Sequence, residues 1–258
     1  MMEKITLKTS LGEIAVFRYA DVPLSTPVIF LHGVYFDHHL WDKQIAAITD
    51  RTVMAIDMPL HGESNVNIKN GWSLSDCGDL LLEILDQLKI ERVIAIGHSW
   101  GSMSIVRAAS KDAGRFAGIG LCNMPFKASS GTEKILIRLQ HMAMPFRNFY
   151  MQQAGKALMG KNSLKMQPEL LQMLMSSMKK MSGKDIRYTD KAVRIDAEDA
   201  TRLLRSLKVP SIALVGKEDY AGIPPLERII TVEGGHVSPV EVPDDVNRMI
   251  REITGMVK

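Results

Sequence analysis

The residues with the clearest chemical signature are Gly97-His98-Ser99-Trp100-Gly101, which place a serine between two glycines. An apolar run at residues 92–97 predicts a strand before the serine, and the pattern of residues 100–110 predicts a helix after it. The turn between such elements is so sharp that the positions two residues before and after the serine require glycine. The first amides of the helix point into the space beside the hydroxyl, where they can stabilise a negatively charged oxygen. The pattern therefore predicts Ser99 as a nucleophile.

A serine hydroxyl is a weak nucleophile at neutral pH, so a base must take its proton and a third group must orient that base. Asp219 and His236 each follow a predicted strand, at residues 211–215 and 228–232. Ligands bind at the carboxyl ends of strands in open α/β sheets, so both side chains are expected at the edge that carries the serine. We therefore expect His236 to act as the base and Asp219 to orient it, with Glu218 as a rival for the acid role.

The elements that must position these residues alternate between apolar runs and amphipathic segments. This alternation predicts an α/β fold in which strands and helices are interleaved around a mainly parallel sheet. Eight strands are expected, at residues 4–9, 13–19, 28–31, 53–56, 92–97, 117–122, 211–215 and 228–232. Helices are expected at about 39–48, 73–88, 100–110, 199–207 and 243–256.

Residues 125–200 differ in character from the rest of the chain, because they contain no convincing strand pattern. Met, Leu and Lys recur there at helical spacings, interrupted by proline and glycine. The segment is therefore expected to be an inserted helical cap, with residues 1–124 and 201–258 forming the core. It holds nine of the 17 methionines. Methionines at this spacing usually pack in a core, but they can also line an adaptable apolar pocket.

Together these motifs resemble the α/β-hydrolase superfamily, in which the chain is identified as a serine hydrolase with a helical cap domain. Leu31-His32-Gly33-Val34 resembles the family's oxyanion loop, and His236 with Glu241 and Pro243 resembles its histidine segment. The resemblance implies the α/β-hydrolase fold, with an eight-stranded, mostly parallel sheet flanked by helices. It also implies a catalytic triad of Ser99, Asp219 and His236, and an oxyanion hole formed by the amides of Val34 and Trp100.

The segment between Asp219 and His236 departs from the family pattern, because it is short for a family that places a full helix there. Residues 222–225, Gly-Ile-Pro-Pro, cannot continue a helix. The helix is therefore expected to be reduced to a loop, which could alter the loop that carries the acid.

The reaction implied by the resemblance is cleavage of a small, apolar carboxylic ester or lactone through an acyl-enzyme on Ser99. Neither a cofactor nor a metal ion is expected. Two other classes of function stay open, because fold and triad do not fix the chemistry. One is hydrolysis of carbon–carbon bonds or cofactor-free peroxide chemistry, and the other is a ligand receptor with slow turnover. The motifs leave the natural acyl and leaving groups and the oligomeric state undetermined.

Composition narrows the range of partners and compartments. The 258 residues are 46% hydrophobic and 24% charged, with a net charge of +3 and no basic stripe, so a nucleic-acid partner is not expected. No apolar run approaches the roughly 20 residues that cross a bilayer, and the first residues lack a signal-peptide pattern. The two cysteines have no metal-ligand spacing. A cytoplasmic protein without stable membrane insertion is expected.

Several other polar residues could be mistaken for catalytic residues. His32, His61 and His98 lie in turn motifs, where they are expected to organise the backbone and not to react. His141 is expected to face solvent. Asn123 follows the strand at residues 117–122, a place where some relatives carry the acid, but an amide cannot balance an imidazolium charge. Asn123 is therefore excluded from the acid role.

Overall fold

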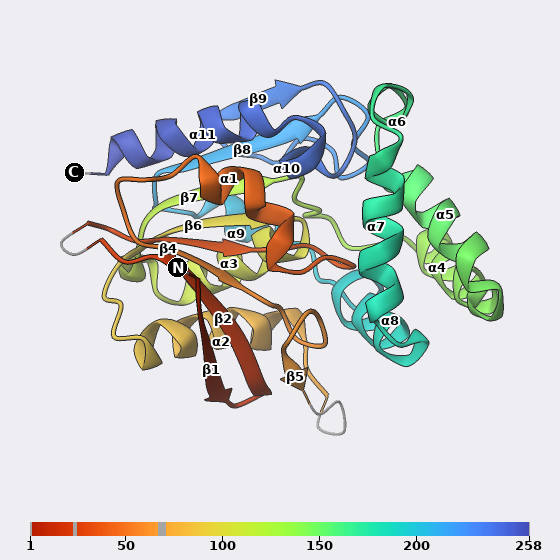
Figure 1. Cartoon of the computed structure of the whole chain (residues 1–258), viewed down its shortest axis with the longest axis horizontal. Coiled ribbons are helices and arrows are strands. Elements are labelled where there is room, and N and C mark those ends of the chain that lie inside the picture. The colour runs from red at the N-terminus through yellow and green to blue at the C-terminus, as the bar shows by residue number, and fades with distance from the viewer. Residues whose placement is uncertain (1, 23–24, 67–70, 258) are drawn as a thin grey trace.

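The computed structural model describes residues 2–22, 25–66 and 71–257, which form a single sheet flanked by helices (Figure 1). The strands are β1 (Glu3–Thr9), β2 (Gly12–Ala20), β3 (Val28–Leu31), β4 (Val53–Ile56), β5 (Asn65–Val66), β6 (Val93–His98), β7 (Phe116–Cys122), β8 (Ser211–Gly216) and β9 (Ile229–Val232). Their order is β1-β2-β4-β3-β6-β7-β8-β9, with β5 paired to β2. β2 is antiparallel to β1, β4 and β5, and the other pairings within the described residues are parallel.

The predicted α/β-hydrolase fold is confirmed, with one correction to the strand count. The described residues form nine strands where eight are predicted, and the additional strand is β5. β5 contains two residues, which pair with Gly12 and Glu13 of β2. A strand of this length is too short to carry a periodic hydrophobic pattern, which explains why the sequence does not reveal it.

Helices cover both faces of the sheet. They are α1 (Asp42–Ala46), α2 (Leu74–Gln87), α3 (Trp100–Lys111), α9 (Thr201–Arg205), α10 (Ser238–Glu241) and α11 (Pro243–Met256), with short 3₁₀ turns at His38–Trp41 and Ala113–Arg115. α2 begins at a capping box, in which the Ser73 hydroxyl accepts a hydrogen bond from the Asp76 amide. The helix predicted at about 39–48 is a 3₁₀ turn followed by the shorter α1.

Alternate residues of the central strands enter two separate cores. On β3, Ile29 and Leu31 pack in the cluster that contains the buried side chains of α2 and α3. Val28 and Phe30 point to the opposite face and pack in the cluster that contains those of α11. Because successive side chains of a strand point to opposite faces, the continuous apolar run of β3 fills both cores.

The register of the parallel strands brings several loops to one edge of the sheet. Leu31 of β3 lies level with Gly97 of β6, and His98 lies level with Cys122 of β7. On the other side, Cys122 lies level with Leu214 of β8. The loops that follow β3, β6, β7 and β8 therefore leave the sheet close together, at its carboxyl edge.

Residues 125–200, named the helical segment below, connect β7 to the helix that precedes β8. The segment contains α4 (Gly131–Met142), a 3₁₀ turn (Met144–Phe146), α5 (Arg147–Leu158), α6 (Lys161–Met166), α7 (Glu169–Lys180), α8 (Gly183–Asp190) and a π-helical turn (Lys191–Ile195). All its residues are described, and none of them is in a strand. Figure 1 shows α4–α8 gathered beyond the carboxyl ends of β8 and β9. Among the described residues, no helix combines the length and apolarity needed to cross a membrane.

Candidate active site

Ser99 occupies a strained turn between β6 and α3, with φ 50° and ψ −110°. The two flanking glycines are required by close contacts and not by the strain alone. A Cβ on Gly97 would lie 2.4 Å from the Ser102 nitrogen, and a Cβ on Gly101 would lie 2.1 Å from the Leu31 oxygen. Such backbone contacts leave no room for a side chain, so the turn holds the serine in a conformation that a free chain rarely adopts.

The structure brings Ser99, His236 and Asp219 into one hydrogen-bonded row. The Ser99 Oγ lies 2.8 Å from Nε2 of His236, and the Nδ1 of His236 lies 2.7 Å from Oδ1 of Asp219. Burial acts to raise the pKa of Asp219, but the neighbouring His236 and the hydrogen bonds to the carboxylate more than offset it, so the pKa is lowered. An ionised carboxylate fixes the proton on Nδ1 and leaves the Nε2 lone pair directed at the serine hydroxyl.

Asn123, at the carboxyl end of β7, joins the loops that carry Asp219 and His236. Its Nδ2 donates to Oδ2 of Asp219 at 2.8 Å and to the carbonyl of Gly235 at 3.0 Å. Its Oδ1 accepts from the amide of Ser238 at 3.2 Å. Sequence reasoning considered this residue only as an acid, and missed it as a positioning residue. The available signal was its place at a strand's carboxyl end.

Glu241 joins the loop of His236 to the helical segment. Its buried carboxylate accepts three backbone hydrogen bonds, from the amides of Gly160 (2.9 Å), Gly235 (2.9 Å) and Val237 (2.8 Å). In addition, the amide of His236 donates to the carbonyl of Leu158, at the end of α5, at 2.6 Å. The helical segment therefore contacts the backbone that carries the imidazole directly.

The two amides predicted to face an oxyanion are unpaired. Neither the Val34 nor the Trp100 amide has a hydrogen-bond partner among the described residues. The next amide after Val34, that of Tyr35, is already occupied, because it donates to Nε2 of His61 at 3.2 Å. Val34 lines the cavity that contains Ser99, and the Trp100 amide is the first of α3. Both are therefore available to a ligand oxygen beside the serine.

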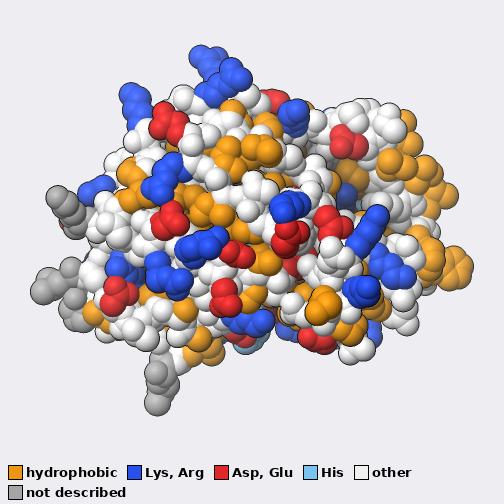
Figure 2. Space-filling view, turned by 90° about the horizontal axis from the view of Figure 1, so that it is seen from above, with side chains coloured by type: hydrophobic (Ala, Val, Ile, Leu, Met, Phe, Trp, Pro, Cys, Tyr) orange, Lys and Arg blue, Asp and Glu red, His pale blue; other side chains and the backbone are white. Residues whose placement is uncertain are grey.

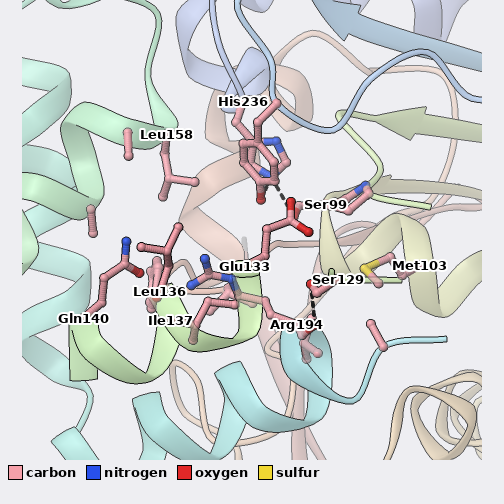
Figure 3. A pocket seen from close by; sticks show the side chains of 18 of the residues that line it. Ser99, Met103, Ser129, Glu133, Leu136, Ile137, Gln140, Leu158, Arg194 and His236 are labelled. Carbon is pink, nitrogen blue, oxygen red and sulfur yellow. Dashed lines mark hydrogen bonds between the residues drawn. The ribbon is translucent and has the colours of Figure 1, made fainter. Parts of the chain in front are cut away.

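A cavity of about 420 Å³ lies between the hydrogen-bonded row and the helical segment (Figure 3). Ser99 and His236 form one wall. The opposite wall is largely apolar and includes Leu136, Ile137, Leu158 and Val193. None of the nine methionines of the helical segment lines this cavity. Five of them are buried in the core instead, namely Met144, Met151, Met159, Met178 and Met181.

Tyr220 packs against the imidazole of His236 and was not identified from the sequence. Its ring centroid lies 4.4 Å from that of His236, and its hydroxyl lies 3.3 Å from Nε2. The loop that carries it, between β8 and β9, contains no helix, as residues 222–225 predict. Tyr220, the residue directly after Asp219, lies in this loop and lines the cavity.

The rival acid lies away from the imidazole. Oε2 of Glu218 accepts a hydrogen bond from the amide of Lys161, in the helical segment, at 3.1 Å. Asp219, and not Glu218, therefore contacts His236. The described residues contain no group of three or more His, Cys, Asp or Glu side chains with the geometry to hold a metal ion.

The side chains of His32, His61 and His98 are buried, and the expectation for His141 was wrong. Burial lowers the pKa of His61 and of His98 to about 3, so both are neutral near pH 7, and it also lowers the pKa of His32. His141 does not face solvent: its side chain is 11% exposed, and its Nε2 donates to Asp190 at 2.8 Å. The sequence around His141 contains no signal for a contact with Asp190, which lies 49 positions further along the chain.

Comparisons with known proteins bear on the fold that carries this site. The sequence pattern of the alpha/beta hydrolase fold matches residues 26–151. The acetyltransferase component of an acetoin cleaving system from Pseudomonas putida is 28% identical over 87% of the chain, and the chain spans 62% of that relative's length. A 3-oxoadipate enol-lactonase from Acinetobacter baylyi is 33% identical over 39% of the chain and 37% of its own length.

Among solved structures, a thermophilic esterase from Thermogutta terrifontis superposes with a TM-score of 0.85 at 22% identity, covering 99% of this chain and 100% of its own. The enol-lactonase from Burkholderia xenovorans superposes with a TM-score of 0.79 at 19% identity, covering 94% and 97%. At these identities the superpositions establish the fold. The matching sequence pattern at residues 26–151 and these superpositions together show that the chain has the α/β-hydrolase fold.

Proposed function

We propose that the protein is a serine hydrolase that cleaves a small carboxylic ester or lactone through an acyl-enzyme on Ser99. The observation that carries this proposal is the row of hydrogen bonds from Ser99 through His236 to Asp219, which ends in a cavity. A hydroxyl with this base and this orienting carboxylate has the arrangement that activates a serine for attack on a carbonyl.

In the proposed reaction, the Ser99 oxygen attacks the carbonyl carbon while His236 takes the hydroxyl proton. The amides of Val34 and Trp100 donate to the oxyanion of the tetrahedral intermediate. His236 then gives its proton to the leaving oxygen as the bond to the carbonyl carbon breaks. Water repeats the sequence on the acyl-enzyme, so the products are a carboxylic acid and an alcohol, or one hydroxy acid from a lactone.

We also propose that residues 125–200 act as a cap on a core made of residues 1–124 and 201–258. The position of α4–α8 beyond the carboxyl ends of the strands supports this division (Figure 1). The apolar wall that the segment contributes supports a small substrate with apolar parts. The esterase and enol-lactonase with the same fold act, by their names, on substrates of this class. Two unpaired, buried cysteines, Cys77 and Cys122, support a cytoplasmic location.

The test is hydrolysis of p-nitrophenyl acetate and butyrate and of a simple lactone by the wild type and by Ser99→Ala. We expect wild-type turnover on at least one substrate and a loss of about 10³-fold or more in kcat for Ser99→Ala. Ser102→Ala, one turn further along α3, is the matched control, because its hydroxyl bonds only to the Cys122 carbonyl. Retained turnover in Ser99→Ala, or no turnover by the wild type on any substrate, would overturn the proposal.

A further inference from the structure

One cationic side chain of the cavity wall, that of Arg194, is partly buried. Arg194, on the π-helical turn, has a side chain that is 32% exposed and lies among the residues of the cavity wall. Figure 3 places it on the far side of the cavity from His236, near α4. The other charged residues of the wall, Lys127 and Glu133, are exposed and carry opposite charges.

The guanidinium of Arg194 is held from behind by a buried carboxylate. Nη1 lies 3.1 Å from Oδ1 of Asp190, one helical turn earlier, whose side chain is fully buried. Asp190 also accepts from the hydroxyl of Tyr35 at 3.1 Å and from Nε2 of His141 at 2.8 Å. Burial acts to raise the pKa of Asp190, but Arg194 and His141 more than offset it, so the carboxylate is ionised. This network fixes the orientation of the guanidinium.

The remaining edge of the guanidinium has no partner in the described chain. All hydrogen bonds of the Arg194 side chain to described residues involve Nη1, so Nε and Nη2 are free to donate. A guanidinium presents these N–H groups in a planar fork that matches the two oxygens of a carboxylate. An oriented fork on the wall of a cavity can bind an anionic ligand group through two parallel hydrogen bonds.

We propose that Arg194 determines substrate specificity by binding a carboxylate on the acyl part of the substrate, remote from the scissile bond. The substrate class is then an ester or lactone whose short apolar chain ends in a carboxylate. The chain would lie along Leu136 and Ile137, between the serine and the guanidinium. This inference rests on the proposed function and names the substrate class of the same site.

The test compares two methyl esters of equal chain length, neutral methyl hexanoate and anionic monomethyl adipate, with hydrolysis followed by proton release. The wild type should prefer the anionic ester by about 10-fold or more in kcat/KM, as expected of a charge-assisted hydrogen-bonded pair. Arg194→Gln should lose that preference, with a clearly larger fall in kcat/KM for monomethyl adipate than for methyl hexanoate. Arg194→Lys, which keeps the charge without the fork, should lie between them. The matched control is Arg138→Gln, an exposed arginine of α4 outside the cavity wall.

A binding measurement separates this inference from the proposed function. Glutarate, an unreactive dicarboxylate, should raise the melting temperature of Ser99→Ala, and the double variant with Arg194→Gln should show no rise. If glutarate stabilises Ser99→Ala through Arg194 but no ester is hydrolysed, the proposed function fails and the anion site stands. Equal wild-type rates on the two esters, no glutarate effect, or an Arg194→Gln loss that is the same on both esters would overturn the inference.

Discussion

The carboxyl edge of the sheet and the helical segment form opposite walls of one cavity, but different forces hold them. At the sheet edge, the side chains of Asp219 and His236 are buried, and each polar atom has a defined partner. The helical segment buries apolar side chains such as Met151 and leaves other large hydrophobic side chains exposed, including Met142, Phe146 and Phe149. Figure 2 shows hydrophobic side chains gathered at one end of the molecule. The sheet edge therefore positions Ser99, His236 and Asp219, and the helical segment supplies the apolar wall of the cavity.

The two regions are nevertheless connected by hydrogen bonds next to His236. Glu241 accepts hydrogen bonds from Gly160 of the helical segment and from Gly235 beside His236. The His236 amide is also bonded to the Leu158 carbonyl. Movement of the end of α5 would therefore move the imidazole. Substitutions in the helical segment are expected to affect turnover where they reach this contact, and only selectivity elsewhere.

The largest effect is expected at the sheet edge, from the carboxylate that we propose orients His236. Asp219→Asn should lower kcat by about 10⁴-fold, because an amide cannot fix the imidazole tautomer or balance its charge. Glu218→Gln is the matched control, since its carboxylate bonds to the Lys161 amide and not to His236, and it should lose less than about threefold. The measurement is ester turnover by both variants. A larger loss in Glu218→Gln would show that the acid is assigned to the wrong neighbour.

The next effect concerns stability within the helical segment. Met151→Ala should lower the free energy of unfolding by about 2–5 kcal/mol, because the side chain is fully buried and its removal leaves a void. Met142→Ala should change it by less than about 0.5 kcal/mol, since that side chain is 73% exposed. Urea titrations of both variants give the two values. Equal values would mean that the helices pack differently from the arrangement described.

A further effect is expected on the pH dependence of the unfolding free energy, because neutral, buried histidines lie near the carboxyl edge of the sheet. His61 and His98 have folded pKa values lowered to about 3, so below the unfolded value near 6.5 the unfolded chain binds more protons. Each histidine should therefore remove up to about 1.4 kcal/mol of unfolding free energy per pH unit between about 6.5 and 3. Urea titrations at pH 7 and 5 measure this slope.

Two matched variants test whether the buried histidines cause this pH dependence of the unfolding free energy. His61→Gln should make the loss on acidification smaller. His39→Gln should leave it as in the wild type, because the His39 side chain is 58% exposed in the folded chain. A wild-type unfolding free energy that does not fall from pH 7 to pH 5 would contradict the burial of these groups.

The difference between the regions also decides how much could be predicted from the sequence. Ser99 could be predicted because short-range steric rules fix its turn, and its glycines record those rules. Asp219 and His236 could be predicted because the carboxyl ends of neighbouring parallel strands meet at one edge. Asn123 and Tyr220 could not be assigned, since their partners lie in other loops and no local pattern encodes these contacts. The two-residue β5 gave no periodic signal either.

In the helical segment, the hydrophobic pattern predicted helices but not which of their side chains face the cavity. Methionines at helical spacing fit both a core and a pocket, and the structure buries Met144 and Met151 in the core. Arg194 and Asp190 are one turn apart, so an ion pair could have been suspected. Their contact with Tyr35, from the loop after β3, depends on the tertiary fold. The residues that line a cavity between two regions can be identified only when the positions of both regions are known.

The central claim is that Ser99 is the nucleophile, and the most direct measurement is the site of labelling by a fluorophosphonate probe. After digestion, mass spectrometry should find the phosphonyl adduct on the peptide that contains Ser99, and fragmentation should assign it to Ser99 and not to Ser102 or Ser104. Labelling should disappear in Ser99→Ala and persist in Ser102→Ala. An adduct on another residue, or a folded wild type that is not labelled, would contradict the account.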